Sequence, residues 1–277
     1  MKKTVLSLFV AFAFVLGATA QVKTPSASPT QTIKEDFALS SIEITYSRPS
    51  MKGRVVFGDL TPYGKMWRTG ANSATKIKFG EDVKVGGVAV KAGEYALYSV
   101  PNKDEWEIII NKGANNSGLN GYKEADDVAR FKVKPMTMAN AVEMFTMQVA
   151  NQTANSAEIH VMWEKTAVAI PVVADIDTKI MSSIDRAMNV DTKPYFEAAS
   201  YYFENGKDLQ KALAWVTSAT TANPKAFWML LLKAKIQAKM GDKAGAIASS
   251  KLSTEMAKEA KNDDYVALNE KLMATLK

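Results

Sequence analysis

The stretch Ser41-Ile-Glu-Ile-Thr-Tyr-Ser-Arg-Pro-Ser50 begins the front half of the chain with apolar side chains at every second position, Ile42, Ile44 and Tyr46. This alternation is typical of a β-strand with one buried face. The period is lost after Tyr46, in a segment where Gly and Pro set unusual backbone angles. The stretch therefore predicts a half-buried strand that runs directly into an irregular loop.

Similar patterns recur up to residue 173. Alternation appears again at Tyr95-x-Leu97-x-Ser99 and Phe131-x-Val133, and apolar runs of strand length occupy residues 106–110, 142–149, 159–163 and 168–173. Turn-forming residues such as Gly86-Gly87 separate them. Eight or nine short strands at this spacing predict an antiparallel β-sandwich or barrel. We assign residues 40–174 to a β-sandwich domain.

The rear half has helical periodicity. Ile176, Ile180, Ile184 and Met188 recur four residues apart and predict a connecting helix within residues 175–193. Further on, Lys207-Asp-Leu-Gln-Lys-Ala-Leu213 and Gly241-Asp-Lys-Ala-Gly-Ala-Ile247 share Asp, Ala and a branched apolar residue at a spacing of 34 residues. Residues 194–277 thus resemble a tetratricopeptide-like helical module, whose usual role is to bind protein or peptide. A purely structural helical tail is the alternative.

The first twenty residues have the pattern of a signal peptide. Lys2-Lys3 precede an apolar run from Val5 to Leu16, and Ala18-x-Ala20 is a cleavage pattern. The run is shorter than the roughly 20 residues that span a membrane. We expect cleavage near Ala20, a leader over residues 21–39 that is disordered over residues 21–28, and no transmembrane span in the mature chain. The product would be exported, either periplasmic or secreted.

Composition excludes several kinds of chemistry. Without residues 1–20 the chain has 33 basic and 29 acidic residues, a mild excess that makes nucleic acid an improbable partner. It has no cysteine and a single histidine, so thiolate catalysis and zinc sites lack their residues. A Ser-His-Asp arrangement would have to use His160, which lies in a strand-like run, and no G-x-S-x-G motif accompanies it. The Asn- and Asp-rich residues 111–127 lack the calcium-loop pattern. We expect no cofactor and no metal.

Residues 46–72 are the best candidate site. Arginine offers a rigid fork for carboxylate or phosphate, and tryptophan or tyrosine offers a stacking face for a sugar or cation. These residue types suit binding rather than proton transfer. The alternative is that the arginines pair with buried carboxylates and the aromatic rings pack beneath the loop. The candidate residues for a ligand or partner are Arg48, Arg54, Tyr63, Trp67, Arg68 and Asn72.

The front domain resembles a family of exported bacterial proteins catalogued as domain of unknown function 2911. The resemblance covers residues 28–173 and rests on Tyr46-Ser-Arg-Pro-Ser50, Gly53-Arg54, Phe57-Gly58, Pro62-Tyr-Gly64, Trp67-Arg-Thr-Gly-Ala-Asn72, Ala92-Gly93-x-Tyr95, Pro101, Trp106, Asn111, Asp127-x-x-Arg130 and Trp163-Glu164. Members often continue into a helical tail. One departure is Ser117-Gly118, where the family usually carries Trp before Gly. The resemblance implies a fold and a compartment but no reaction.

These observations favour a non-enzymatic, exported cell-envelope protein. Its helical tail would bind a protein partner, and the Arg/Trp loop would be a binding or assembly surface. The first alternative is a site for a glycan or an anionic small molecule around the candidate residues. The second is a carboxylate-dependent hydrolase, for which Glu143 and Glu164 are possible acids.

Overall fold

The computed structural model describes residues 24–190 and 193–276. The expected signal peptide therefore lies outside the described residues. The chain forms two compact units that meet in sequence between Ala174 and Asp175, where strand periodicity gives way to helical periodicity.

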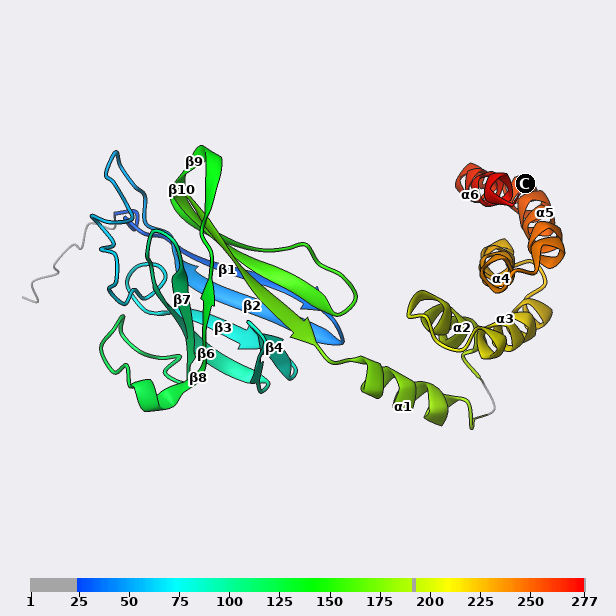
Figure 1. The fold of residues 1–277 in the computed structure, drawn as a ribbon, viewed down its shortest axis with the longest axis horizontal. Helices are drawn as coiled ribbons and strands as arrows, with labels where there is room; N and C mark the ends of the chain where they lie inside the picture. Colours follow the sequence, from blue (N-terminus) through cyan, green and yellow to red (C-terminus); the bar gives the residue numbers. More distant parts are fainter. Residues whose placement is uncertain (1–23, 191–192, 277) are drawn as a thin grey trace, which may run out of the picture. The chain divides into compact units, whose positions relative to one another are not determined.

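The front unit is a pair of antiparallel sheets, which confirms the predicted sandwich (Figure 1). The larger sheet has the order β1-β2-β3-β6-β7-β8, and the smaller has β5-β4-β10-β9. A single 3₁₀ turn, η1 (Glu124–Asp126), precedes β8. The strands are β1 (Thr30–Phe37), β2 (Ser40–Ser47), β3 (Thr75–Phe79), β4 (Val83–Val85), β5 (Val88–Val90), β6 (Gly93–Val100), β7 (Trp106–Asn111), β8 (Asp127–Val133), β9 (Met136–Ala150) and β10 (Ser156–Ala174).

The predicted leader over residues 21–39 is wrong for its second half, because residues 30–37 form strand β1. This strand pairs with β2 along its whole length, from Thr30 opposite Ser47 to Phe37 opposite Ser40. Ile33 and Phe37 are its only apolar residues, so its sequence shows no clear alternation of apolar and polar side chains. β1 is an edge strand, where polar side chains on both faces are tolerated.

The described front unit has ten strands rather than eight or nine. The three short strands β3, β4 and β5 were not predicted, whereas the predicted runs 159–163 and 168–173 are parts of one long strand, β10. The register between β9 and β10 shifts on both sides of Glu164, which has a φ of +54°. This irregularity explains why the apolar pattern looked like two strands.

The chain crosses from one sheet to the other directly after β2. The Phe145 N–H of β9 donates to the Pro49 carbonyl at 2.9 Å, and the Met51 N–H donates to the Glu143 carbonyl at 2.9 Å. The hydroxyl of Tyr46 accepts from the Met147 N–H at 2.9 Å. We call residues 46–51 the sheet clamp, because they join the last residues of β2 to the other layer.

Arg48 is the charged member of the sheet clamp. Its Nε donates to the Phe145 carbonyl at 3.0 Å, and its Nη2 donates to the Thr146 hydroxyl at 3.0 Å. Its own backbone N–H donates to the Pro29 carbonyl at 2.9 Å, just before β1 begins. One guanidinium fork thus satisfies two acceptors on β9, a geometry that a lysine ammonium cannot reproduce.

A second polar network fixes the loop between β7 and β8. Arg130 bonds to Glu107 at 2.6 Å and to Asp127 at 2.7 Å, and it also donates to the Tyr122 hydroxyl at 2.8 Å. The side-chain amide of Asn111 donates to Asp127 at 2.7 Å. Asn111, Asp127 and Arg130 belong to the pattern that carried the family resemblance, and the structure gives them a role in holding the loop against the sheet edge.

The rear unit consists, in its described residues, of six helices: α1 (Asp177–Ala187), α2 (Tyr195–Glu204), α3 (Leu209–Ala222), α4 (Phe227–Met240), α5 (Lys243–Glu259) and α6 (Asp263–Thr275). Ala212 in α3 and Ala246 in α5, which stand 34 residues apart, are both fully buried. Close packing of small side chains at this period is typical of the predicted tetratricopeptide-like pairs. No helix in the described residues is long and apolar enough to cross a membrane.

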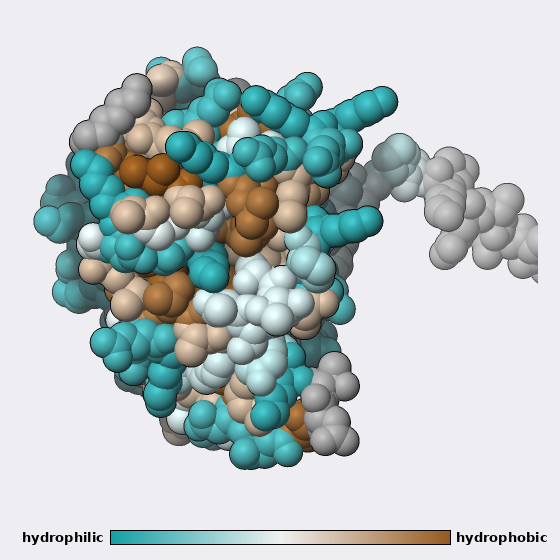
Figure 2. Space-filling model, turned by 90° about the vertical axis from the view of Figure 1, so that its right-hand side faces the viewer, coloured by the Kyte–Doolittle hydropathy of each residue, from teal (hydrophilic) through white to brown (hydrophobic). Residues whose placement is uncertain are grey.

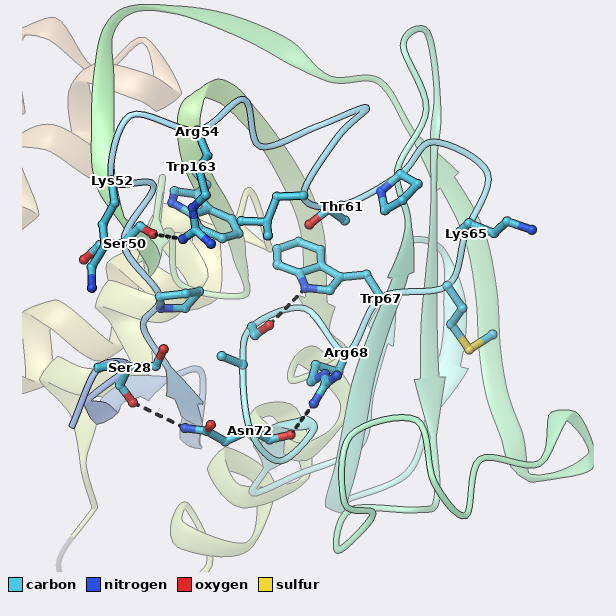
Figure 3. Close-up of a pocket in the computed structure, with 17 residues that line it drawn as sticks. Ser28, Ser50, Lys52, Arg54, Thr61, Lys65, Trp67, Arg68, Asn72 and Trp163 are labelled. Atoms are coloured by element: carbon cyan, nitrogen blue, oxygen red, sulfur yellow. Dashed lines mark hydrogen bonds between the residues drawn. The ribbon is translucent and has the colours of Figure 1, made fainter.

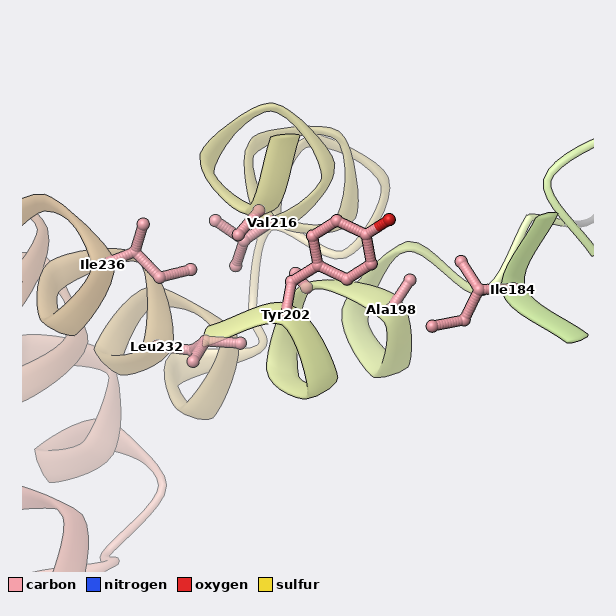
Figure 4. Close-up of a cluster of buried hydrophobic side chains, with 8 residues drawn as sticks. Ile184, Ala198, Tyr202, Val216, Leu232 and Ile236 are labelled. Atoms are coloured by element: carbon pink, nitrogen blue, oxygen red, sulfur yellow. The ribbon is translucent and has the colours of Figure 1, made fainter. Parts of the chain in front are cut away.

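Helix α1, predicted as a connecting helix over residues 175–193, is part of the helical core. Ile184 packs in one buried cluster with Ala198 and Tyr202 of α2 (Figure 4). Asp177 at the start of α1 accepts from the Tyr201 hydroxyl at 2.7 Å and from Lys207 Nζ at 2.8 Å. The extra helix therefore braces a module that has only two complete helix pairs.

Polar side chains replace apolar ones in the second repeat unit. Gln237 is buried, donates to Asp242 at 3.0 Å and accepts from the Ser249 hydroxyl at 2.7 Å. Asn269 of α6 is fully buried and bonds to both Ser250 and Ser253 of α5. Because each group is paired, this seam avoids the cost of burying unsatisfied polar atoms.

The first prediction concerns the sheet clamp. Arg48→Lys should lower the free energy of unfolding by about 1–3 kcal/mol, because it leaves the Phe145 carbonyl or the Thr146 hydroxyl without its charged donor. Arg54→Lys is the control: Arg54 is exposed and bonds only within its own loop, so its change should stay within about 0.5 kcal/mol. Urea unfolding followed by tryptophan fluorescence measures both. Equal stability of the two variants would contradict the clamp.

A second prediction concerns alkaline pH. Burial, together with the hydrogen bond to Asp127, raises the pKa of Tyr122 from 10.0 to about 12. The folded state therefore holds the phenol proton more tightly than the unfolded state, and this contribution to stability is complete below pH 10 and is lost as the pH rises towards 12. Tyr122→Phe should flatten the fall in stability over this range. An unchanged pH profile would contradict the assignment.

Candidate functional site

A pocket of about 520 Å³ opens on the loop that follows the sheet clamp (Figure 3). Its polar and charged lining comes from Ser28, Ser50, Lys52, Arg54, Thr61, Lys65, Arg68 and Asn72, and its aromatic lining from Trp67 and Trp163. Four of these side chains are cationic, and no carboxylate from the described part of the chain lines the pocket. The volume is in the range of pockets that hold small organic ligands.

The two tryptophans belong to a buried aromatic cluster. The rings of Trp67 and Trp163 stack at 5.9 Å with 18° between their planes, and Phe57, Trp106 and Phe145 pack edge-on around Trp67. Trp67 is 9% exposed and Trp163 is 2% exposed. Trp67 therefore does not offer the open stacking face that the sequence suggested. Each aromatic pair adds about 0.5–1.5 kcal/mol beyond the area that it buries, so the cluster is a rigid floor.

The turn after Trp67 has an unusual backbone. Thr69 is fully buried with a φ of +52°, and Asn72 has a φ of +59°. Positive φ is rare for a β-branched residue such as threonine and persists only where the surroundings fix it. Here the Thr69 hydroxyl bonds to the Ser99 hydroxyl at 2.9 Å, and the Trp67 indole N–H donates to the Gly70 carbonyl at 3.0 Å.

Arg68 reaches the pocket from this turn. Its Nη1 donates to the Asn72 carbonyl at 2.8 Å, which leaves other guanidinium N–H groups available. The guanidinium lies against Gly118, where an added Cβ would come within 2.7 Å of Nη1. Ser117-Gly118, noted in the sequence as a departure from the family pattern, thus lies beside the pocket and leaves room for the Arg68 side chain.

Arg54 lies on the opposite side of the Trp67 ring in Figure 3, in the turn after the sheet clamp. Its Nε donates to the Met51 carbonyl at 2.9 Å and its Nη2 to the Ser50 carbonyl at 2.7 Å. These two bonds fix the guanidinium and leave its remaining N–H groups unused. The side-chain nitrogens of both arginines, of Lys52 and of Lys65 form no ion pair with a carboxylate of the described residues within 4.0 Å.

The structure brings four of the six candidate residues together: Arg54, Trp67, Arg68 and Asn72 all line the pocket. Arg48 does not line it, because its guanidinium faces β9. The ring of Tyr63 lies over Gly58, where an added Cβ would come within 2.7 Å of it, and it too lies outside the pocket lining. None of Arg48, Arg54 and Arg68 forms an ion pair with a carboxylate of the described residues, contrary to the first part of the alternative. Its second part, aromatic rings packed beneath the loop, agrees with the burial of Trp67.

Several lining residues were not anticipated. Lys52 and Lys65 stand in the same loop but lack the arginine fork that drew attention to their neighbours. Ser28 falls in the stretch read as leader, and its carbonyl accepts from the Asn72 amide at 3.4 Å. Trp163 arrives from β10, almost a hundred residues later in the chain. Only the closing of the sandwich brings these groups to one place.

The two glutamates considered as acids of a hydrolase accept hydrogen bonds from backbone N–H groups instead. Glu143 accepts from the Lys52 N–H at 2.9 Å, and Glu164 accepts from the Val56 N–H at 3.0 Å. The structure thus engages both carboxylates in anchoring residues 52–56. Neither lines the pocket, so the arrangement offers no pair of acids facing a substrate there.

The remaining titratable candidate, His160, lies half-buried on β10. Its Nε2 is 2.8 Å from Oε2 of Glu158, and this contact, together with the hydrogen bond from Asn151, lowers the pKa of Glu158 below its usual value. The described residues contain no group of three or more His, Asp or Glu side chains that could hold a metal ion. His160 thus bonds to a neighbouring carboxylate on the same strand.

No curated protein and no solved structure matches this chain. The family model described as "Protein of unknown function (DUF2911)" matches residues 28–172, which is more than half of the chain and nearly all of the front unit. The strands, the sheet clamp and the pocket all lie within that range, apart from the last residues of β10. The chain therefore belongs to the DUF2911 family.

Proposed function

We propose that the front unit is a binding module for an anionic small molecule, which Arg54 and Arg68 hold in the pocket above the tryptophan floor. The observation that carries this proposal is that four cationic side chains line the pocket without any carboxylate among the described lining residues, and that none of the four forms an ion pair there. Unpaired arginines that are already fixed by backbone carbonyls lose little freedom when they bind an anion. The pocket is therefore prepared for negative charge before any ligand enters.

The chemistry of the lining supports binding rather than catalysis. Its side chains offer guanidinium, ammonium, hydroxyl and amide groups, and the nearby Glu143 and Glu164 bond to backbone. General acid–base catalysis needs a group within hydrogen-bond reach of the proton to be moved, with a pKa near the working pH. Arginine cannot fill that role, because it stays protonated. Each charge-assisted hydrogen bond to a ligand would instead contribute about 1.5–3 kcal/mol.

Export is part of the same proposal. The pattern of residues 1–20 supports a signal peptide, and a periplasmic or secreted module would meet its anion, such as an acidic glycan fragment, outside the cytoplasm.

A protein partner of the helical unit remains a prediction. On the face seen in Figure 2, apolar atoms form several separate patches among polar side chains, without one continuous apolar surface.

The third prediction tests the binding module. Glucuronate and inorganic phosphate should raise the melting temperature of the full chain at fixed ionic strength, because they bind only the folded state, whereas glucose should not. Arg68→Gln should abolish the shift. Gly118→Ala should weaken it, because the new Cβ displaces the Arg68 guanidinium.

The matched control is Arg186→Gln in α1, an exposed arginine of the other unit, which should leave the shift intact. An equal shift with glucose, or a full anion shift in Arg68→Gln, would overturn the proposal. Absence of any shift with both anions would overturn it as well.

A further inference from the structure

The cations of the pocket belong to two separate groups. Lys52 and Arg54 come from the turn that follows the sheet clamp, whereas Arg68 comes from the turn after Trp67. In Figure 3 the Trp67 ring lies between Arg54 and Arg68, and the Lys65 side chain points away from both. Two distinct backbone turns thus present positive charge from two sides of one floor.

We infer that the pocket takes a dianion whose two acidic groups stand at opposite ends of a compact neutral body. This inference rests on the proposed function and names its ligand class. An anion with a single acidic group would leave part of the positive charge of the pocket unneutralised. A ligand with separated charges neutralises both groups, and Coulomb attraction then acts at each end.

Each arginine is held so that it can receive one end of such a ligand. Nη2 and Nε of Arg54 donate to the carbonyls of Ser50 and Met51, which leaves Nη1 for a ligand. Nη1 of Arg68 donates to the carbonyl of Asn72, which leaves Nε and Nη2 for a ligand. Because these anchors are backbone groups on different turns, the separation of the two guanidinium groups is set by the fold.

The surface between the two arginines is neutral. Apart from Lys52, Lys65 and the two arginines, the pocket lining has no charged side chain in the described residues, and it includes Trp67, Gly70, Ala71, Ser28 and Ser50. A pocket of about 520 Å³ is far larger than one carboxylate or phosphate group needs. The middle of the ligand would therefore be an uncharged chain or ring that carries hydroxyl or apolar groups, as in a linear dicarboxylate or a disaccharide with an acid at each end.

The experiment compares isomers that have equal charge and different spacing. Succinate and adipate carry their carboxylates at the two ends, whereas methylmalonate and propylmalonate, their respective isomers, carry both on one carbon. Calorimetric titration of the full chain at constant ionic strength should give at least tenfold tighter binding for one end-to-end diacid than for its isomer. Arg54→Gln and Arg68→Gln should each reduce this preference to less than twofold while leaving the unliganded melting temperature within a few degrees.

The outcomes separate the two claims. If both isomers of each pair bind equally well and binding still needs Arg68, the dianion inference fails and the proposed function stands. If a preference for end-to-end diacids persists in Arg54→Gln, the assignment of the two ends fails. If none of the four diacids binds, and glucuronate and phosphate also leave the melting temperature unchanged, both claims fail.

Discussion

Hydrogen bonds between residues 46–51 and β9 tie together the two layers of the front unit. The Phe145 N–H donates to the Pro49 carbonyl, the Arg48 guanidinium donates to the Phe145 carbonyl, and the Tyr46 hydroxyl accepts from the Met147 N–H two residues further on. Each bond joins residues about a hundred positions apart in sequence. Because such contacts close long loops, they constrain the chain far more than local turns do. The irregular loop after residue 51 therefore starts from a fixed point.

The pocket follows from this constraint and from the aromatic cluster beneath it. Once the clamp fixes residues 46–51, Trp67 packs on Trp163, and the carboxylates of Glu143 and Glu164 turn to backbone N–H groups. Both carboxylates are thereby engaged by the backbone N–H groups of Lys52 and Val56, and neither lines the pocket. Thr69 keeps its left-handed backbone only because buried partners surround it. The structural contacts of this motif and the proposed binding role thus belong to different residues.

Much of the fold could be predicted from sequence, because the period-two pattern indicates strands and the 34-residue spacing indicates helix pairs, and both can be read along the chain without knowing its long-range contacts. Strand β1 was not predicted, because an edge strand needs little apolar character. Strand β10 was predicted as two strands, because its register with β9 shifts near Glu164. Part of the pocket lining could be predicted: arginines in a loop indicate recognition, and two of the arginines so chosen, Arg54 and Arg68, line the pocket. Sequence could not tell that Arg48 faces inward to β9, nor that Trp163 and Ser28 join the pocket, because those depend on how the two sheets close.

Residue-resolved hydrogen exchange of the unmodified chain tests the clamp most directly. The account predicts that the amides of Met51, Trp67 and Phe145, which donate to Glu143, Ser99 and Pro49, exchange as slowly as that of Ile44 in the centre of β2. They would then open only with the whole sandwich. Exchange as fast as in the exposed turn of residues 151–155 would contradict the account, because the loop would then be a mobile surface whose arginines are not held in place.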